Sequence, residues 1–254
     1  MVIRFLGTGT SQGVPLIGCN CEVCTSTNTK DKRLRSSVFI EHNGTQIVID
    51  TGTDFRQQML RENINHIDGI VYTHEHKDHL AGMDDIRAFN FKTRKAVNLY
   101  ATERVQNAIR AEFAYVFEIA NYTSVPQINF NTISHQNNFN VENITLTPIQ
   151  VMHAKMPVLG FRVGNFTYIT DANYISETEL QKIKGTDVLV LNALRREDHV
   201  SHFNLQQALN LVELIKPRIA YFTHISHQLG THNDVNNELP SNVFLAYDGL
   251  IINV

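Results

Sequence analysis

Short apolar runs separated by polar turns dominate the chain and predict a protein rich in buried β-strands. Short runs rich in Val, Ile and Phe are typical of buried strands, whereas apolar positions three and four residues apart are typical of helices. Strands are predicted at residues 2–6, 37–41, 46–49, 69–72, 98–101, 128–130, 144–147, 149–152, 159–163, 166–170, 188–191, 219–222, 243–247 and 250–254. Helices are predicted at residues 55–63, 83–92 and 204–215, and a further helix begins at Thr102.

Turn and capping residues support several of these boundaries. Asn43-Gly44, between two predicted strands, indicates a hairpin, and Asn204 with Gln207 forms a capping-box start for the helix at 204–215. Asp248, which precedes a glycine, is interpreted as a turn former. In the predicted helix at 83–92, the residues expected to face the core are Ile86, Phe89 and Phe91.

Length and composition predict a globular cytoplasmic protein. A chain of 254 residues with 43% hydrophobic residues can bury a substantial core, and we expect a single domain over residues 1–254. No apolar run approaches the roughly 20 residues of a membrane helix, and the residues after Met1 lack the features of a signal peptide. The net charge of -3 provides no field suited to a nucleic-acid backbone, which favours a small substrate and no membrane partner.

The strongest chemical signal is the run His74–His79, in which three histidines and one aspartate have the spacing HxHxDH. Imidazole nitrogens and carboxylate oxygens are ligands that borderline divalent metals bind. A single histidine is usually a surface or core residue, but this density indicates a metal site. Because the run follows the predicted strand at 69–72, its ligands are expected in a loop at the end of that strand.

Three further candidate ligands also follow predicted strands, namely His153, Asp171 and His224. Each has an ordinary alternative, because a single His is more often a hydrogen-bonded structural residue and a single Asp a turn former. Their joint placement predicts that one sheet edge gathers them beside His74–His79. Asp50 also follows a predicted strand and is a candidate to orient a metal-bound imidazole by a hydrogen bond.

All three cysteines of the chain lie close together, at Cys19, Cys21 and Cys24. They are too near one another in sequence for a disulfide framework, but the spacing C-x-C-x₂-C lets three thiolates reach one zinc ion. The alternative is a group of free buried thiols. His227, which follows His224 by three residues, is the candidate fourth ligand, although an exposed structural role is the alternative for it. We expect a structural zinc site in a loop at about residues 18–25.

His202 precedes the predicted helix at 204–215 and is a candidate general acid toward a leaving oxygen. His199 lies three positions earlier and is the competing candidate for this role. Both would act near the end of the predicted strand at 188–191.

Five motifs together resemble one branch of the metallo-β-lactamase superfamily. They are GTGTSQGVP (residues 7–15), GCNCEVC (18–24), THEHKDH (73–79), THISHQ (223–228) and YDG (247–249). Nearly end to end, the chain is similar to the phosphoribosyl 1,2-cyclic phosphate phosphodiesterases (PhnP-like) of carbon-phosphorus lyase operons. The resemblance implies an α/β fold of the metallo-β-lactamase αββα type, with two mixed β-sheets flanked by helices in one domain over residues 1–254.

The resemblance also implies a dinuclear site of two divalent metal ions, Zn or Mn. One ion would be held by His74, His76 and His153, the second by Asp78, His79 and His224, with Asp171 bridging both. A structural Zn at Cys19, Cys21, Cys24 and His227 would accompany them. The implied reaction is hydrolysis of a small cyclic phosphodiester by a hydroxide bridging the two metals, with Asp78 orienting the hydroxide and His202 protonating the leaving group. The resemblance further suggests a homodimer.

Three other functions remain open. tRNA 3′-processing-type endonucleases share the ligand set, but we expect a long basic arm between the third histidine and the bridging aspartate in them, where this chain has residues 154–170. A glyoxalase-type thioesterase or lactonase would use similar metals on a carbonyl substrate. A non-catalytic metal-binding scaffold would bind metals and fail every substrate screen.

Overall fold

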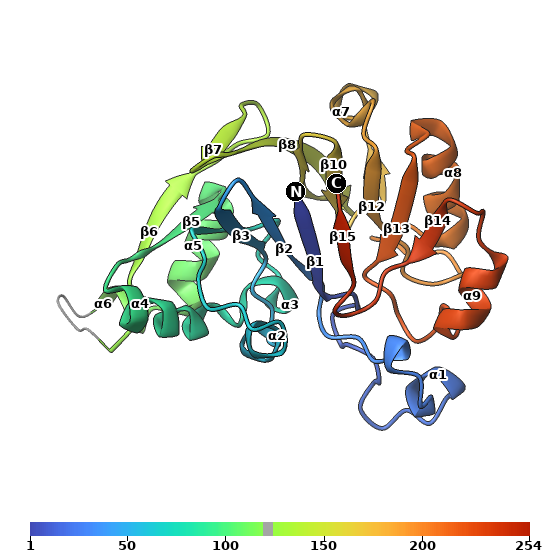
Figure 1. Cartoon of the computed structure of the whole chain (residues 1–254), viewed down its shortest axis with the longest axis horizontal. Helices are drawn as coiled ribbons and strands as arrows, with labels where there is room; N and C mark the ends of the chain where they lie inside the picture. Colours follow the sequence, from blue (N-terminus) through green and yellow to red (C-terminus); the bar gives the residue numbers. More distant parts are fainter. Residues whose placement is uncertain (119–123) are drawn as a thin grey trace.

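The computed structural model describes residues 1–118 and 124–254. Two mixed β-sheets pack face to face, and helices cover both outer faces (Figure 1). This arrangement confirms the αββα sandwich of the metallo-β-lactamase fold. No helix in the described ranges is both long enough and apolar enough to cross a membrane.

The first sheet contains the strands of the N-terminal half and the last strand of the chain. The strands are β1 (Val2–Gly7), β2 (Ser37–His42), β3 (Thr45–Ile49), β4 (Gly69–Val71), β5 (Val97–Ala101), β6 (Ile128–Thr132) and β15 (Ile251–Asn253). Their order is β15-β1-β2-β3-β4-β5-β6. The pairs from β15 to β3 are antiparallel, and those from β3 to β6 are parallel.

The second sheet contains strands of the C-terminal half. The strands are β8 (Ile144–His153), β9 (Met156–Val163), β10 (Phe166–Ile169), β11 (Tyr174–Ile175), β12 (Val188–Asn192), β13 (Ile219–Thr223) and β14 (Val243–Leu245), and β7 (Phe139–Val141) pairs with β8 beside this path. Their order is β11-β8-β9-β10-β12-β13-β14. The strands β10, β12, β13 and β14 run parallel.

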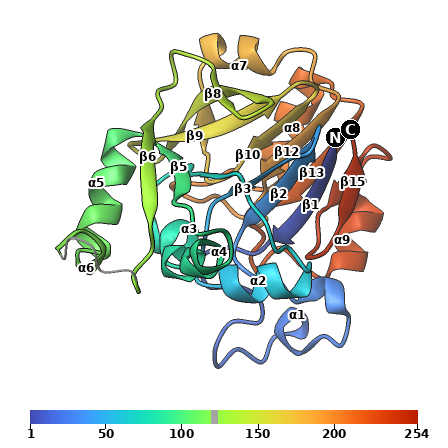
Figure 2. The ribbon, with the colours of Figure 1, turned by 60° about the vertical axis from the view of Figure 1, so that its left-hand side comes forward.

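The α-helices of the described residues are α1 (Glu22–Thr25), α2 (Phe55–Arg61), α3 (Lys77–Leu80), α4 (Arg87–Thr93), α5 (Glu103–Glu112), α6 (Tyr115–Glu118), α7 (Glu177–Ile183), α8 (Leu205–Ile215) and α9 (His232–Glu238). Short 3₁₀ turns occur at η1 (Thr29–Asp31) and η2 (Met83–Ile86). Figure 2 shows α2 and α4 against the first sheet, and Figure 1 shows α8 and α9 beside the second.

Three apolar layers hold the sandwich together. The central layer lies between the sheets and includes Phe5, Val38 and Phe161, all fully buried. A second layer packs helices α2, α4 and α5 on the first sheet, and a third packs α8 and α9 on the second. Because burying apolar area supplies about 25 cal/mol per Å², these layers fix both sheets and therefore the strand ends between them.

Several predicted elements differ from those observed. The predicted strands at 144–147 and 149–152 form one strand, β8, which continues through Pro148. This residue lies between the stretches of β8 that pair with β7 and β11, so its missing N–H leaves both of those pairings intact. The strand predicted at 243–247 ends at Leu245, and the one predicted at 250–254 is β15, Ile251–Asn253.

The helix predicted at 83–92 begins as the 3₁₀ turn η2 and continues as α4. Ile86 and Phe89 are buried as predicted, but the prediction for Phe91 was wrong, because half of its side chain is exposed. A 3₁₀ turn has about three residues per turn, so it shifts the face that later residues present to the core.

Asp248 does more than form a turn. Its carboxylate is largely buried and accepts hydrogen bonds from the Thr8 hydroxyl at 2.7 Å and the Leu34 amide at 2.7 Å. The C-terminal YDG motif therefore ties the end of β1 to the segment before β2.

Candidate metal centre

The parallel strands of both sheets end at one edge of the sandwich, and the predicted ligands lie there. Asp78, His79, Asp171 and His224 have ligand atoms within 4.8 Å of one another, and the same holds for His74, His76 and Asp171. Asp78 and His79 lie in the short helix α3 rather than in the loop expected from the sequence. The structure thus brings together side chains that follow three separate strands, β4, β10 and β13.

Three residues at this sheet edge have left-handed backbone conformations. Asp50, Asp171 and His224 have φ angles of 66°, 54° and 56°, in the left-handed region. This conformation costs an L-residue roughly 1–2 kcal/mol, and strained residues of this kind cluster at functional sites. The turn directs each side chain into the edge instead of along its strand.

The carboxylate of Asp171 divides its two oxygens between different imidazoles. Oδ1 lies 3.0 Å from His224 Nδ1 and 3.3 Å from His79 Nε2, whereas Oδ2 lies 3.8 Å from His74 Nε2. A carboxylate with one oxygen toward each group of imidazoles could serve as a ligand shared by two cations. The side chain of Asp171 is almost fully buried, so solvent screens these interactions little.

Asp50 orients His79 from behind, as predicted. The Asp50 carboxylate accepts a hydrogen bond from His79 Nδ1 at 2.7 Å, and it also accepts from the amide and the hydroxyl of Thr73. Both Asp50 and His79 are fully buried. Because Nδ1 is engaged with Asp50, Nε2 of His79 is directed at Asp78 and Asp171, which is the usual arrangement behind a metal-bound histidine.

Two adjacent glycines let α3 approach this hydrogen-bond network. A Cβ atom on Gly52 would lie 2.1 Å from the carbonyl oxygen of Asp78, and one on Gly82 would lie 2.2 Å from the carbonyl oxygen of Gly52. A side chain at either position would therefore force Gly52 apart from the backbone of residues 78–82.

The electrostatics of the cluster favour a cation. Burial opposes charge on His79 and Asp171, but attraction between carboxylates and imidazoles outweighs it, so the pKa of His79 is raised and that of Asp171 lowered. Burial lowers the pKa of His74, whose ring faces His79. Within the described residues, the Nε2 atoms of His74 and His79 have no hydrogen-bond partner. Unpaired buried nitrogens beside carboxylates fit divalent cations.

His153 lies on the His74 and His76 side of the centre. Its ring centroid is 5.7 Å from that of His74 and 5.1 Å from that of His76, and its Nδ1 donates to the Ser201 carbonyl at 2.8 Å. The hydrogen bond fixes the ring so that Nε2 is free to act as a ligand.

His202 lies between the two histidines at the ends of β8 and β13. Its ring is 4.6 Å from His153 and 4.8 Å from His224 by centroids, and its ligand atom also falls within 4.8 Å of those of His153 and Asp171. His199 packs behind it at 5.0 Å. His202 is thus the nearer of the two candidate acids to Asp171.

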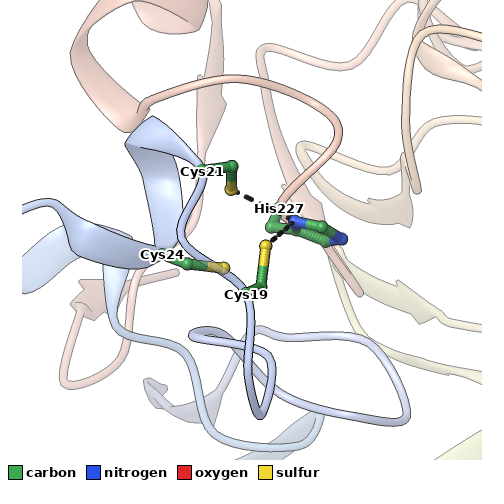
Figure 3. Close-up of side chains that lie close together, drawn as sticks. All are labelled: Cys19, Cys21, Cys24 and His227. Carbon is green, nitrogen blue, oxygen red and sulfur yellow. Dashed lines mark hydrogen bonds between the residues drawn. The ribbon is translucent and has the colours of Figure 1, made fainter.

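The structure brings the three cysteines together with His227, and these four residues form a second candidate metal site. Their sulfur atoms point toward His227 (Figure 3), and all four ligand atoms lie within 4.8 Å of one another. His227 Nδ1 is 3.3 Å from Cys21 Sγ and 3.5 Å from Cys19 Sγ. The hydrogen bond with His227 lowers the pKa of Cys21 to about 6. Thiolates and one imidazole are the donor set of structural zinc.

Backbone hydrogen bonds connect the N-terminal loop to the turn that carries His224. Ile225 donates its amide to the Thr8 carbonyl at 2.9 Å, and Thr10 donates its amide to the Ile225 carbonyl at 3.1 Å. The hydroxyl of Thr10 lies 3.3 Å from His224 Nε2. Because His224 and His227 share one turn, the two candidate metal sites are mechanically connected.

Supporting residues of the centre were missed by the sequence analysis. Thr73 lies 2.9 Å from His74 Nδ1 through its hydroxyl, and Asn192 exchanges two hydrogen bonds with the backbone of Ala172, next to Asp171. The Thr of THEHKDH was visible as part of the motif, but nothing in the sequence connects Asn192 with residue 172.

The αββα sandwich, with imidazoles and carboxylates gathered at one sheet edge, defines the class of metallo-β-lactamase-fold hydrolases. The family described as "Beta-lactamase superfamily domain" matches residues 45–225. The chain belongs to this superfamily, and within it the chain is PhnP-like.

Known proteins support this assignment. A crystal structure of a new diphosphatase from the PhnP family superimposes with a TM-score of 0.93 at 38% identity, over 100% of this chain and 97% of that one. Zn²⁺-bound PqqB from Methylobacterium extorquens superimposes with a TM-score of 0.80 at 19% identity, over 100% of both chains, which shows the shared fold.

A protein of Porphyromonas gingivalis named octanoyltransferase is 36% identical over 247 residues, which cover 96% of this chain and 50% of that protein. The chain therefore spans about half the length of this relative.

We expect Asp50→Asn to weaken binding of divalent cations about 10- to 100-fold, because the variant lacks the charge that orients His79. Metal affinity would be measured by competition with a chromogenic chelator. Asp187→Asn is the matched control, since Asp187 pairs with Asn165 away from the centre. Equal affinity of Asp50→Asn and the unmodified protein would contradict this role of Asp50.

We expect Cys24→Ser to remove about one zinc ion per chain and to lower the midpoint of thermal unfolding by about 5 °C or more. Cation binding at the Asp171 centre should weaken as well, because the turn carrying His224 loses its tie to the cysteine loop. Elemental analysis would measure the zinc content, and calorimetry would measure the unfolding midpoint and the cation binding. Ile17→Ser is the control in the same loop, where Ile17 is 99% exposed. A variant that retains all its zinc would refute the cysteine site.

Proposed function

We propose that the chain hydrolyses a small phosphodiester such as a phosphoribosyl 1,2-cyclic phosphate. The proposal is carried by one observation, the buried carboxylate of Asp171, whose oxygens face the imidazoles of two separate clusters. The full-length likeness to a PhnP-family diphosphatase supports phosphoryl chemistry. In both a diester and a diphosphate, an oxygen must leave a negatively charged phosphorus centre.

The proposed ligands of the first cation are His74, His76 and His153, and those of the second are Asp78, His79 and His224. Asp171 contacts both groups. When bound, two divalent cations would supply Lewis acidity toward the phosphoryl oxygens and a water of lowered pKa. Zn and Mn both suit this donor set. A structural Zn is proposed at the cysteine site, whose donors are thiolates and an imidazole.

Two side chains are proposed to take part in the reaction directly. The carboxylate of Asp78 lies 3.1 Å from His79 Nε2 and faces the same space as Asp171, so it can accept a hydrogen bond from the attacking water and orient it. His202 is proposed to protonate the departing alkoxide. Burial lowers the pKa of His202, and a bound phosphate anion beside the ring would oppose this effect and favour its protonated form.

The other activities considered from the sequence have less support. Residues 154–170 form β9, β10 and their turns, which leaves no room there for the long arm expected of tRNA 3′-processing-type endonucleases. The name of the octanoyltransferase relative makes hydrolysis of an acyl substrate a second candidate activity, and the thioesterase alternative belongs to the same class of reaction. A panel of cyclic ribose phosphates and thioesters would separate these activities, and failure of every substrate would favour a metal-binding scaffold. A homodimer and the absence of a membrane partner remain proposals.

We expect His76→Ala and Asp171→Ala each to reduce turnover of bis(p-nitrophenyl) phosphate by more than about 10³-fold, because each removes a proposed ligand of the cations that would stabilise charge on the phosphate. Release of p-nitrophenolate would measure turnover, and circular dichroism would report folding. His66→Ala is the control, since His66 is exposed and pairs with Asp68. Unchanged turnover in either site variant would overturn the proposed function.

We expect His202→Ala to slow release of an alkyl leaving group about 10²-fold or more. Release of p-nitrophenolate should slow far less, since this stable anion leaves without a proton. The comparison would use two phosphodiesters that differ only in the leaving group, methoxide in one and p-nitrophenolate in the other. His199→Ala is the control. Equal losses for the two leaving groups would show that His202 has a structural role, and a selective loss in His199→Ala would assign the proton to His199.

A further inference from the structure

A cavity of about 390 Å³ lies directly beside the segment that carries the candidate ligands His74 and His76. Thr73 and Glu75, the residues on either side of His74, both line it. Its walls come from the ends of β5 and β6 and from the β8–β9 hairpin. We call it the polar pocket and define it by six lining residues: Glu75, Thr102, Arg104, Thr132, Ser134 and Gln150. It therefore continues the same sheet edge that holds the candidate metal centre.

Three polar side chains in this pocket are available to a ligand. The Glu75 Oε1 atom pairs with the Arg104 guanidinium at 2.5 Å, whereas its Oε2 atom has no hydrogen-bond partner among the described residues. Within the same residues, the hydroxyl of Ser134 and the side-chain amide of Gln150 also lack protein partners. Together these groups offer a carboxylate, a hydroxyl and an amide at one place.

The charge of the pocket disfavours a second phosphate. Arg104 is already paired with Glu75, and Glu103 adds another carboxylate to the lining. The uncharged part of a sugar matches the pocket better, because carboxylates accept hydrogen bonds from sugar hydroxyls. The apolar lining residues Pro157 and Leu159 can pack against the C–H face of a sugar ring.

We propose that the polar pocket binds the sugar portion of the phosphodiester substrate. Glu75 accepts a hydrogen bond from a free hydroxyl of the sugar through Oε2, and Ser134 and Gln150 bind the other exposed oxygens of the sugar. Because Glu75 stands between His74 and His76, a sugar held there places its phosphate over the neighbouring centre. Binding energy from such a remote group positions the reacting phosphate. The inference rests on the proposed function for the reaction itself.

The test compares two phosphodiesters with one leaving group, ribose 5-(p-nitrophenyl phosphate) and methyl p-nitrophenyl phosphate. The metal-loaded enzyme should prefer the ribosyl ester by about tenfold or more in kcat/KM, because each hydroxyl pairs with a group otherwise left without a partner. This preference should appear mainly as a lower KM. Glu75→Gln and the double variant Ser134→Ala with Gln150→Ala should bring the ratio of the two kcat/KM values close to one.

Gln136→Ala is the matched control, because Gln136 is an exposed glutamine two residues from Ser134 and outside the pocket lining. It should keep the preference of the unmodified enzyme. Hydrolysis of both esters without preference, or a preference that survives in the pocket variants, would overturn the pocket assignment and leave the proposed function intact.

A binding measurement keeps the inference testable if neither ester is hydrolysed. Ribose 5-phosphate should bind at least about tenfold more tightly than methyl phosphate by calorimetry, and the pocket variants should lose this difference. Such a preference without turnover would support the pocket and overturn the phosphodiesterase. Equal binding of the two phosphates would overturn the pocket.

Discussion

The structure depends on one constraint, the concentration of buried carboxylates and imidazoles at a single sheet edge. Asp171 lies within 3.8 Å of three imidazoles, and Asp50 supports one of them from behind. Burying such groups is costly unless they are paired or bind a metal. The three apolar layers compensate for this cost by fixing the strands whose ends carry the side chains. The same edge then extends into the polar pocket, so the proposed sugar site lies beside the candidate metal centre.

The N-terminal loop extends this constraint beyond the sheets. It carries the cysteines, and its backbone pairs with the turn between His224 and His227. Arg33, fully buried in the same region, donates to the Thr8 hydroxyl and the Ala246 carbonyl at 2.8 and 2.6 Å. The loop, the His224 turn and the C-terminal segment therefore form one connected unit, in which a metal at the cysteines would stiffen a ligand of the other centre.

Much of the fold could be predicted because its strands are short, apolar and bounded by turn residues. Predictions were wrong where the local hydrophobic pattern did not reflect the backbone geometry. The 3₁₀ turn η2 changes the helix face, which leaves Phe91 exposed. Pro148 is tolerated within β8 because it lies between the stretch that pairs with β7 and the stretch that pairs with β11. The helices α7 and α9 were missed although Ser176 and Thr231 accept hydrogen bonds from the amides of Glu179 and Asp234 as N-caps. These helices are short, and their apolar periodicity is too weak to stand out.

The sequence by itself determined the chemistry of the candidate ligands, since HxHxDH, the cysteine spacing and strand-end His and Asp residues are local patterns. Only the tertiary structure decided which of them meet. The division of the Asp171 oxygens, the support of His79 by Asp50 and the polar pocket between β6, β8 and the ligand turn all join residues far apart in the chain. Their proximity follows from sheet order and from the packing of the two sheets, which depend on the summed burial of the core and are not encoded in any single segment.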